Sequence, residues 1–84
     1  MPYIPEHNRE AILCSVKELL EEIDTVGGFA YALTELLRGM VGSQPDFHEL
    51  SKILGVYESV KLEYYRRLMA PYEDRKCAEN GDVF

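Results

Sequence analysis

The sequence has no tryptophan, only two cysteines and no long apolar run. Cys14 and Cys77 lie 63 positions apart and form neither a CxxC pair nor a multi-bridge framework, which favours a reducing compartment over a secreted scaffold. No stretch reaches the roughly 18 apolar residues that span a bilayer, and charges from Glu6 onward interrupt any signal-peptide core. We therefore expect a cytoplasmic protein without membrane contact.

Positive charge is also scarce, with nine Lys and Arg residues against fifteen Asp and Glu residues and a net charge of −6. Residues 1–51 contain three basic and nine acidic side chains, whereas residues 52–84 contain six of each and are neutral. A protein that binds the phosphate backbone needs a basic stripe. The charge distribution therefore argues against nucleic acid as a ligand.

The chain of 84 residues is 46% hydrophobic and predicts one small domain, residues 1–84. A domain of this size buries only about 60–65% of its unfolded surface, which leaves its stability marginal and makes a partner subunit a reasonable expectation. Strand-like alternation, internal repeats and low-complexity tracts are missing from the sequence. An all-α fold follows as the prediction.

Apolar spacing predicts three helices after an extended lead-in, residues 1–5. The first runs from about Pro5 to Asp24, and Gly27-Gly28 is interpreted as the turn before a second helix that ends near Gly42. A third helix begins after Asp46 or Ser43 as a cap, is kinked or broken at Pro71, and ends at Asn80. We predict a compact three-helix bundle with a flexible tail, residues 80–84. The first-helix stripe consists of Ile12, Leu13, Val16, Leu19, Leu20 and Ile23.

The third helix has two apolar stripes on different sides. The main stripe consists of Leu50, Ile53, Leu54, Tyr57, Val60, Tyr64 and Leu68. The second stripe, Leu62, Tyr65 and Met69, lies roughly 110° away when successive residues are placed about 100° apart. Either the first two helices clasp the third from both sides, or the second stripe is a subunit or partner interface.

Tyrosines and arginines next to the second stripe strengthen the interface interpretation. Rigid rings and guanidinium groups dominate interaction hot spots. The same residues are also compatible with a half-packed, half-solvated helix, with Glu63–Arg67 and Glu58–Lys61 as helical ion pairs. The predicted interface consists of Leu62, Tyr65, Met69, Tyr64, Arg66, Arg67 and Tyr72.

An enzymatic alternative rests on the acidic residues Glu18, Glu21 and Glu22, with Asp82. Facing glutamates hold Mg²⁺ in all-α nucleotide pyrophosphatases. Here the apolar arc of the first helix places the three glutamates outward, so we predict no metal, cofactor or catalytic residue. A helix-turn-helix regulator is a third hypothesis, which the acidic charge opposes.

Cys14 lies almost opposite the first-helix stripe, so it is either exposed or part of a second interface. A catalytic thiolate needs a basic or histidine neighbour, and Lys17 and His7 are the only local candidates. This pattern does not favour nucleophilic catalysis.

Several segments resemble a family of small uncharacterised proteins of tailed phages and bacteria. The matching segments are Pro2–Pro5, Val60–Arg67, Ala70–Lys76 and Glu79–Val83, about half of the chain. The resemblance implies no catalytic residue or cofactor. It implies a shared signature, for packing or partner contact, of Tyr64, Arg66, Arg67, Pro71, Tyr72, Glu73 and Asp74. We expect a non-enzymatic helical protein that forms a homo-dimer or binds a protein partner through its third helix.

Overall fold

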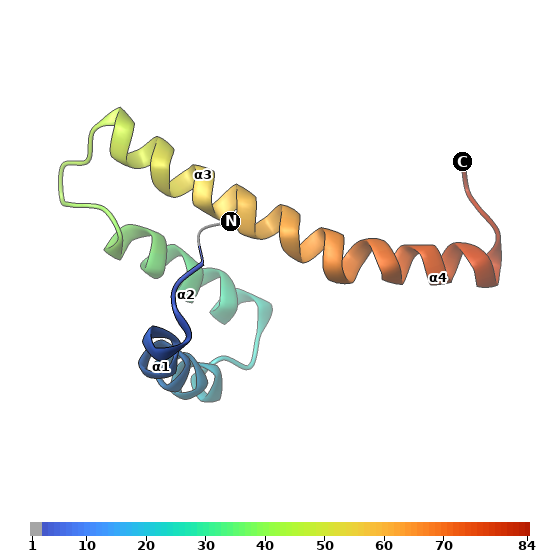
Figure 1. The fold of residues 1–84 in the computed structure, drawn as a ribbon, viewed down its shortest axis with the longest axis horizontal. Helices are drawn as coiled ribbons and strands as arrows, with labels where there is room; N and C mark the ends of the chain where they lie inside the picture. The colour runs from blue at the N-terminus through green and yellow to red at the C-terminus, as the bar shows by residue number, and fades with distance from the viewer. Residues whose placement is uncertain (1–2) are drawn as a thin grey trace.

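A computed structural model describes residues 3–84 of the chain, and all its regular structure is helical (Figure 1). No strand occurs between residues 3 and 84, which confirms the all-α prediction. The elements in chain order are the 3₁₀ turn η1 (Glu6–Asn8), α1 (Arg9–Glu22), α2 (Val26–Gly39), α3 (Phe47–Tyr64), the π-helical turn η2 (Tyr65–Met69) and α4 (Ala70–Asn80).

The chain reverses between α1 and α2 at residues 23–25. Thr25 has extended backbone angles, and its Oγ1 accepts a hydrogen bond from the Gly28 amide at 2.9 Å, so it caps α2. The interpretation of Gly27-Gly28 as the turn is wrong, because both glycines lie in the first turn of α2. Gly28 suits this position because a Cβ there would lie 3.2 Å from Thr25 Oγ1.

The predicted third helix is a single continuous helix of 34 residues made of α3, η2 and α4, called here the long helix. Asp46 caps its N-terminus as predicted, because Asp46 Oδ1 accepts a hydrogen bond from the Glu49 amide at 2.9 Å. The helix ends after Asn80 at Gly81, which has a φ of 89° and donates its amide to the Cys77 carbonyl at 2.8 Å. Three helices with a long third one are therefore confirmed.

Pro71 does not end the long helix, because η2 accommodates it. Proline has no amide hydrogen, and its ring clashes with the carbonyl four residues earlier, which here belongs to Arg67. The wider π turn sets the preceding hydrogen bond one residue further back, from the Ala70 amide to the Tyr65 carbonyl. The helix therefore continues into α4, with Pro71 in its first turn.

The segments that flank the helices lack regular secondary structure. In the lead-in, the Ile4 carbonyl accepts a hydrogen bond from Arg9 Nε at 3.0 Å, which ties residue 4 to the start of α1. Residues 1–2 of the predicted lead-in lie outside the described residues. In the C-terminal segment the Phe84 amide donates to Asp82 Oδ1 at 2.9 Å.

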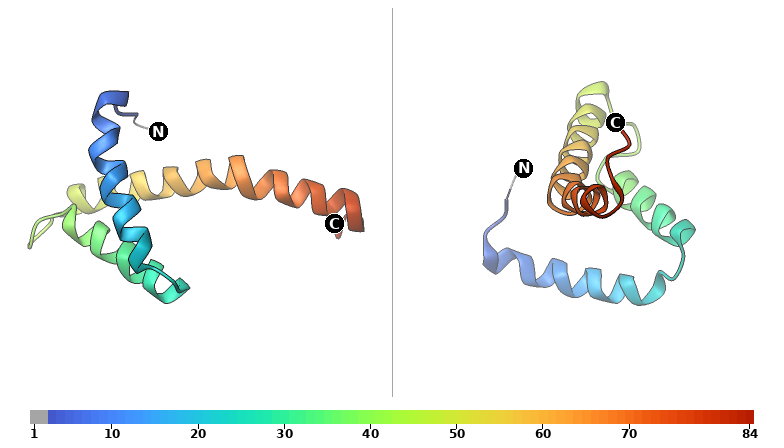
Figure 2. Two further views of the ribbon diagram at one scale, coloured as in Figure 1. Left: turned by 90° about the horizontal axis from the view of Figure 1, so that it is seen from below. Right: turned by 90° about the vertical axis from the view of Figure 1, so that its right-hand side faces the viewer.

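The helices form an open arrangement. Figure 2 (right) looks along the long helix and shows α1 apart from α3, with α2 connecting the two. The radius of gyration is 16.7 Å, compared with about 12 Å for a typical compact domain of this length. The three helices are thus more extended than a typical compact bundle.

Burial is correspondingly shallow: none of residues 3–84 is buried. Most half-buried apolar side chains lie at the two ends of α2, where it meets the end of α1 and the start of α3; these two junctions are called here the packed corner. They include Ile23, Ala32, Leu33, Leu37, Val41 and Ile53. The first three turns of α1 and most of α4 lie outside this packed corner.

Candidate interaction surface on the long helix

The seven residues predicted as an interface all lie on the long helix between positions 62 and 72, and all seven are exposed. They do not form one face. Leu62, Tyr65 and Met69 form the apolar second stripe, whereas Arg66 and Arg67 join an ion cluster with Glu63, and Tyr72 lies near two cations.

Both apolar stripes of the long helix are open to solvent. Every residue of the second stripe is exposed, and so is every residue of the main stripe except Ile53, which is half-buried. The prediction that the first two helices clasp the long helix from both sides is wrong, because only α2 lies beside α3, along its N-terminal half (Figure 1).

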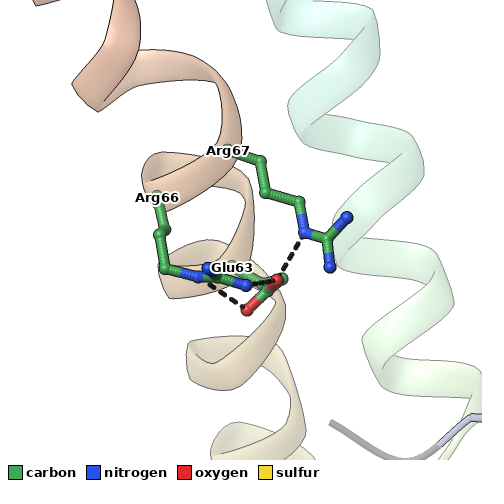
Figure 3. Close-up of polar contacts among 3 residues, drawn as sticks. All are labelled: Glu63, Arg66 and Arg67. Carbon is green, nitrogen blue, oxygen red and sulfur yellow. Dashed lines mark hydrogen bonds and ion pairs between the residues drawn. The ribbon is translucent and has the colours of Figure 1, made fainter.

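Glu63 is the centre of an ion cluster that spans the π turn. Arg66 donates from Nη2 and Nε to the Glu63 carboxylate, the latter at 3.4 Å, and Arg67 Nε donates to Oε1 at 2.5 Å (Figure 3). The two arginines approach one carboxylate from consecutive positions, three and four residues further on, so they reach it from two sides. The cluster fixes the arginine side chains beside the helix.

Electrostatics follow from this geometry. The hydrogen bonds from Arg66 and then Arg67 lower the pKa of the Glu63 carboxyl from its ordinary 4.5 to about 2. The bond to Glu63 raises the pKa of the Arg67 guanidinium, and Tyr3 of the lead-in contributes in the same direction.

Tyr72 begins a second polar group one turn after the π turn. Arg75 Cζ lies 5.9 Å and Lys76 Nζ 5.8 Å from the centre of its ring, within reach of cation–π attraction. Lys76 also pairs with Glu79 at 3.2 Å. This end of the long helix thus offers an aromatic ring with cations on one side.

Two open apolar hollows lie next to the helices. One, of about 460 Å³, lies between α1 and α2; the other, of about 300 Å³, lies along the long helix. The apolar residues of the first are Leu19, Ile23, Tyr31, Ala32 and Leu36, and those of the second are Val60, Tyr64 and Leu68. The second hollow is lined by these main-stripe residues together with Glu63 and Arg67 of the ion cluster.

The acidic residues of the enzymatic alternative do not converge. Glu18, Glu21 and Glu22 are exposed on α1. Within residues 3–84 there is no group of three or more His, Cys, Asp or Glu side chains that could hold a metal ion. Cys14 and Cys77 are free and exposed. In the single chain, Cys14 is therefore exposed to solvent.

Sequence reasoning found the Glu63–Arg67 and Glu58–Lys61 pairs, both present in the structure. It missed the participation of Arg66 and the π turn. Pro71 was the available signal for the π turn, because a proline that does not end a helix must displace a hydrogen bond of the preceding turn.

Fold and surface together define an all-α protein whose long helix has unpartnered apolar sides. The chain belongs to the family described as Domain of unknown function (DUF6899), whose model matches residues 1–83. No curated protein and no solved structure matches the chain. None of the described helices is both long and apolar enough to cross a membrane.

Proposed function

We propose that this protein is a non-enzymatic helical interaction protein that self-associates or binds a protein partner through its long helix. The observation that carries the proposal is the exposure of both apolar stripes of that helix. Exposed apolar surface beyond a few hundred Å² on a soluble chain is typical of an interaction site.

The residue types on the long helix support the same function. Tyrosine and arginine are enriched among the residues that contribute most binding energy. Here Tyr65 lies within the second stripe, and Arg66 is held beside it by Glu63. An arginine that is already oriented loses less side-chain entropy when it binds.

The test replaces Leu62, Tyr65 and Met69 with glutamine. Because three apolar contacts are lost, the protein concentration at the midpoint of assembly should rise about a hundredfold or more. Light scattering across a concentration series measures the mass, and far-UV circular dichroism of the same samples measures the helix content.

A matched control places glutamine at Lys52 and Ser59, which lie on the same helix but on neither stripe. The control should assemble like the wild type. An unchanged midpoint in the triple variant would contradict the proposal. So would a triple variant that stays unfolded at the highest concentration, because the second stripe would then serve folding alone.

The magnesium-dependent pyrophosphatase alternative has no structural observation in its favour. It is tested by adding MgCl₂ and a nucleotide panel to the purified protein. A metal-induced rise in melting temperature together with release of pyrophosphate would establish it in place of the interaction proposal.

We also propose that the protein acts in the cytoplasm of a bacterial cell, as a phage or bacterial product. The wide spacing of its two free cysteines and the segments that resemble phage and bacterial proteins support this. Cell fractionation with an antibody tests the location.

A further inference from the structure

The chain exposes far more surface than a folded monomer of its mass. Its accessible surface is 7730 Å² for 9.7 kDa, whereas a typical monomer of that mass exposes about 5,100 Å². The excess of about 2,600 Å² measures the surface that the chain leaves uncovered.

Part of this surface lies on α1, outside the predicted interface. Ile12, Leu13, Val16 and Leu20 belong to the first-helix stripe, the side on which α1 should join a core, and all four are exposed. α1 and α3 lie on different sides of the molecule, with α2 connecting them (Figure 2). One occupant that extends across both helices would cover the two apolar surfaces together.

The size of the excess favours a folded subunit over a short peptide as the occupant. If two copies cover each other's excess, the contact buries about 5,000 Å² in total, which is within the range of permanent homodimers. A short peptide or a transient partner, which covers about 800 Å² or less on each side, would leave most of the excess open.

Charge indicates which part of a second copy makes the contact. Two chains of net charge −6 repel each other, and the whole excess of negative charge lies in residues 1–51. Residues 52–84, most of the long helix, are neutral, so they can approach the acidic α1 of another copy without net repulsion. The long helix is also apolar on two sides, so it can contact α2 of its own chain and α1 of its partner at once.

From these observations we infer that a second copy of this chain covers the first-helix stripe with its long helix, so that two chains complete one helical core as a twofold dimer. The inference rests on the proposed function and adds to it the identity of the partner and the role of α1. Self-complementary contact of this kind is the usual form of a twofold dimer.

The experiment compares the reactivity of thiols on two sides of α1. One single-cysteine protein retains Cys14, opposite the stripe, and carries Cys77→Ser. The other carries Val16→Cys, within the stripe, together with Cys14→Ser and Cys77→Ser. Both positions are exposed in the single chain. Reaction rates with a thiol reagent are measured above and below the assembly midpoint found by light scattering.

In a dimer that covers α1, the thiol of the Val16→Cys protein should react about tenfold more slowly than Cys14, because reaction requires local opening. Dilution below the midpoint should bring the two rates together. Leu13→Cys in the same background is the second probe, used if the Val16→Cys protein fails to assemble.

Three outcomes would overturn the inference. Equal rates in an assembled protein would mean that α1 is uncovered, and the proposed function of the long helix would stand. A monomeric mass at every concentration would exclude the second copy, and a mass of three or more chains would exclude the dimer.

Discussion

The two apolar stripes of the long helix lie on different sides of it but are open to nearly the same extent. Leu54 of the main stripe is 59% exposed and Leu62 of the second stripe is 57% exposed. In a chain that folds alone, a core stripe is buried and an interface stripe is exposed. The near-equality here means that the single chain covers neither stripe more than the other.

The packed corner of the molecule gives the contrast. Where α2 meets α3, Leu37 and Ile53 reach half-burial. In α4 only Ala70 and Pro71, at its start, are half-buried, and every residue of α1 is exposed. Within residues 3–84, burial against a neighbouring helix is thus concentrated at the two ends of α2.

The largest expected effect tests whether both stripes are covered in the assembled protein. Leu54→Ala and Leu62→Ala should each lower the free energy of unfolding by about 2–4 kcal/mol, the cost of removing a buried leucine side chain. Urea unfolding above the assembly midpoint measures this value. If the leucine is exposed in the assembled protein, its replacement should lower the free energy of unfolding by only a few tenths of a kcal/mol, because leucine and alanine have similar helix propensities.

Lys52→Ala is the control for these two variants. It also shortens a side chain of the long helix to alanine, but Lys52 belongs to neither stripe. A loss confined to Leu54→Ala would assign the main stripe to the interface and leave the second stripe in solvent. The reverse result would favour the second stripe alone.

The next effect concerns the alignment of the stripes across the π turn. Pro71→Ala restores an amide donor and removes the clash with the Arg67 carbonyl, so we expect η2 to relax to α-helix. Relaxation would rotate α4 by about one residue, or roughly 100°, relative to α3. Tyr72 would then leave its position relative to Tyr65, so assembly should weaken about tenfold while helix content stays the same.

Light scattering and circular dichroism measure the two quantities separately. The control is Ala70→Ser, which keeps the proline and therefore the π turn. Unchanged assembly of the Pro71→Ala protein would show that the relative rotation of α3 and α4 does not matter for the interface.

Local sequence signals were sufficient for the helices but not for their arrangement. Asp46 and Gly81 mark the ends of the long helix because capping depends on groups within one turn. The prediction of a turn at Gly27-Gly28 was wrong, because Thr25 caps α2 and both glycines lie in the first turn of that helix. The π turn depends on how the chain accommodates Pro71, which spacing alone does not determine.

The sequence places the seven predicted residues on the long helix, but it does not show that they divide among the second stripe, the Glu63 ion cluster and the Tyr72 group. The periodicity identified both stripes, and it cannot distinguish a stripe that faces the same chain from one that faces a partner. The compact bundle was expected because an apolar α1 normally folds onto α3. The position of α1 depends on the connection at residues 23–25, whose geometry the periodicity does not specify.

A smaller effect sharpens the boundary of the second stripe. Gly55 lies inside α3 on the side of Leu62, and nothing lies within 4 Å of a Cβ built there. Gly55→Ala should therefore raise the free energy of unfolding by about 0.5–1 kcal/mol, since glycine loses more conformational freedom on folding. A loss in urea unfolding would mean that a second copy approaches the backbone closely at this position; Ser59→Ala serves as the comparison.

The smallest effect concerns Glu63, which belongs to neither stripe. Its ion pairs are partly exposed and screened by water and salt, so they contribute less than apolar contacts. The pKa of Glu63 is lowered in the folded state, so its stabilisation is fully present above the unfolded pKa of about 4.5 and is lost as the pH falls to about 2. The stability difference between the wild type and Glu63→Gln should shrink over this interval.

The comparison variant is Glu35→Gln, which breaks one ion pair, with Arg38 at 3.1 Å, on α2. Urea midpoints of all three proteins between pH 7 and 2 give the measurement. Glu63→Gln should raise the protein concentration at the assembly midpoint about threefold at pH 7, because it frees Arg66 and Arg67 from the carboxylate that orients them but removes no apolar contact. An unchanged midpoint would instead exclude the ion cluster from the interface and leave the contact to the apolar stripes alone.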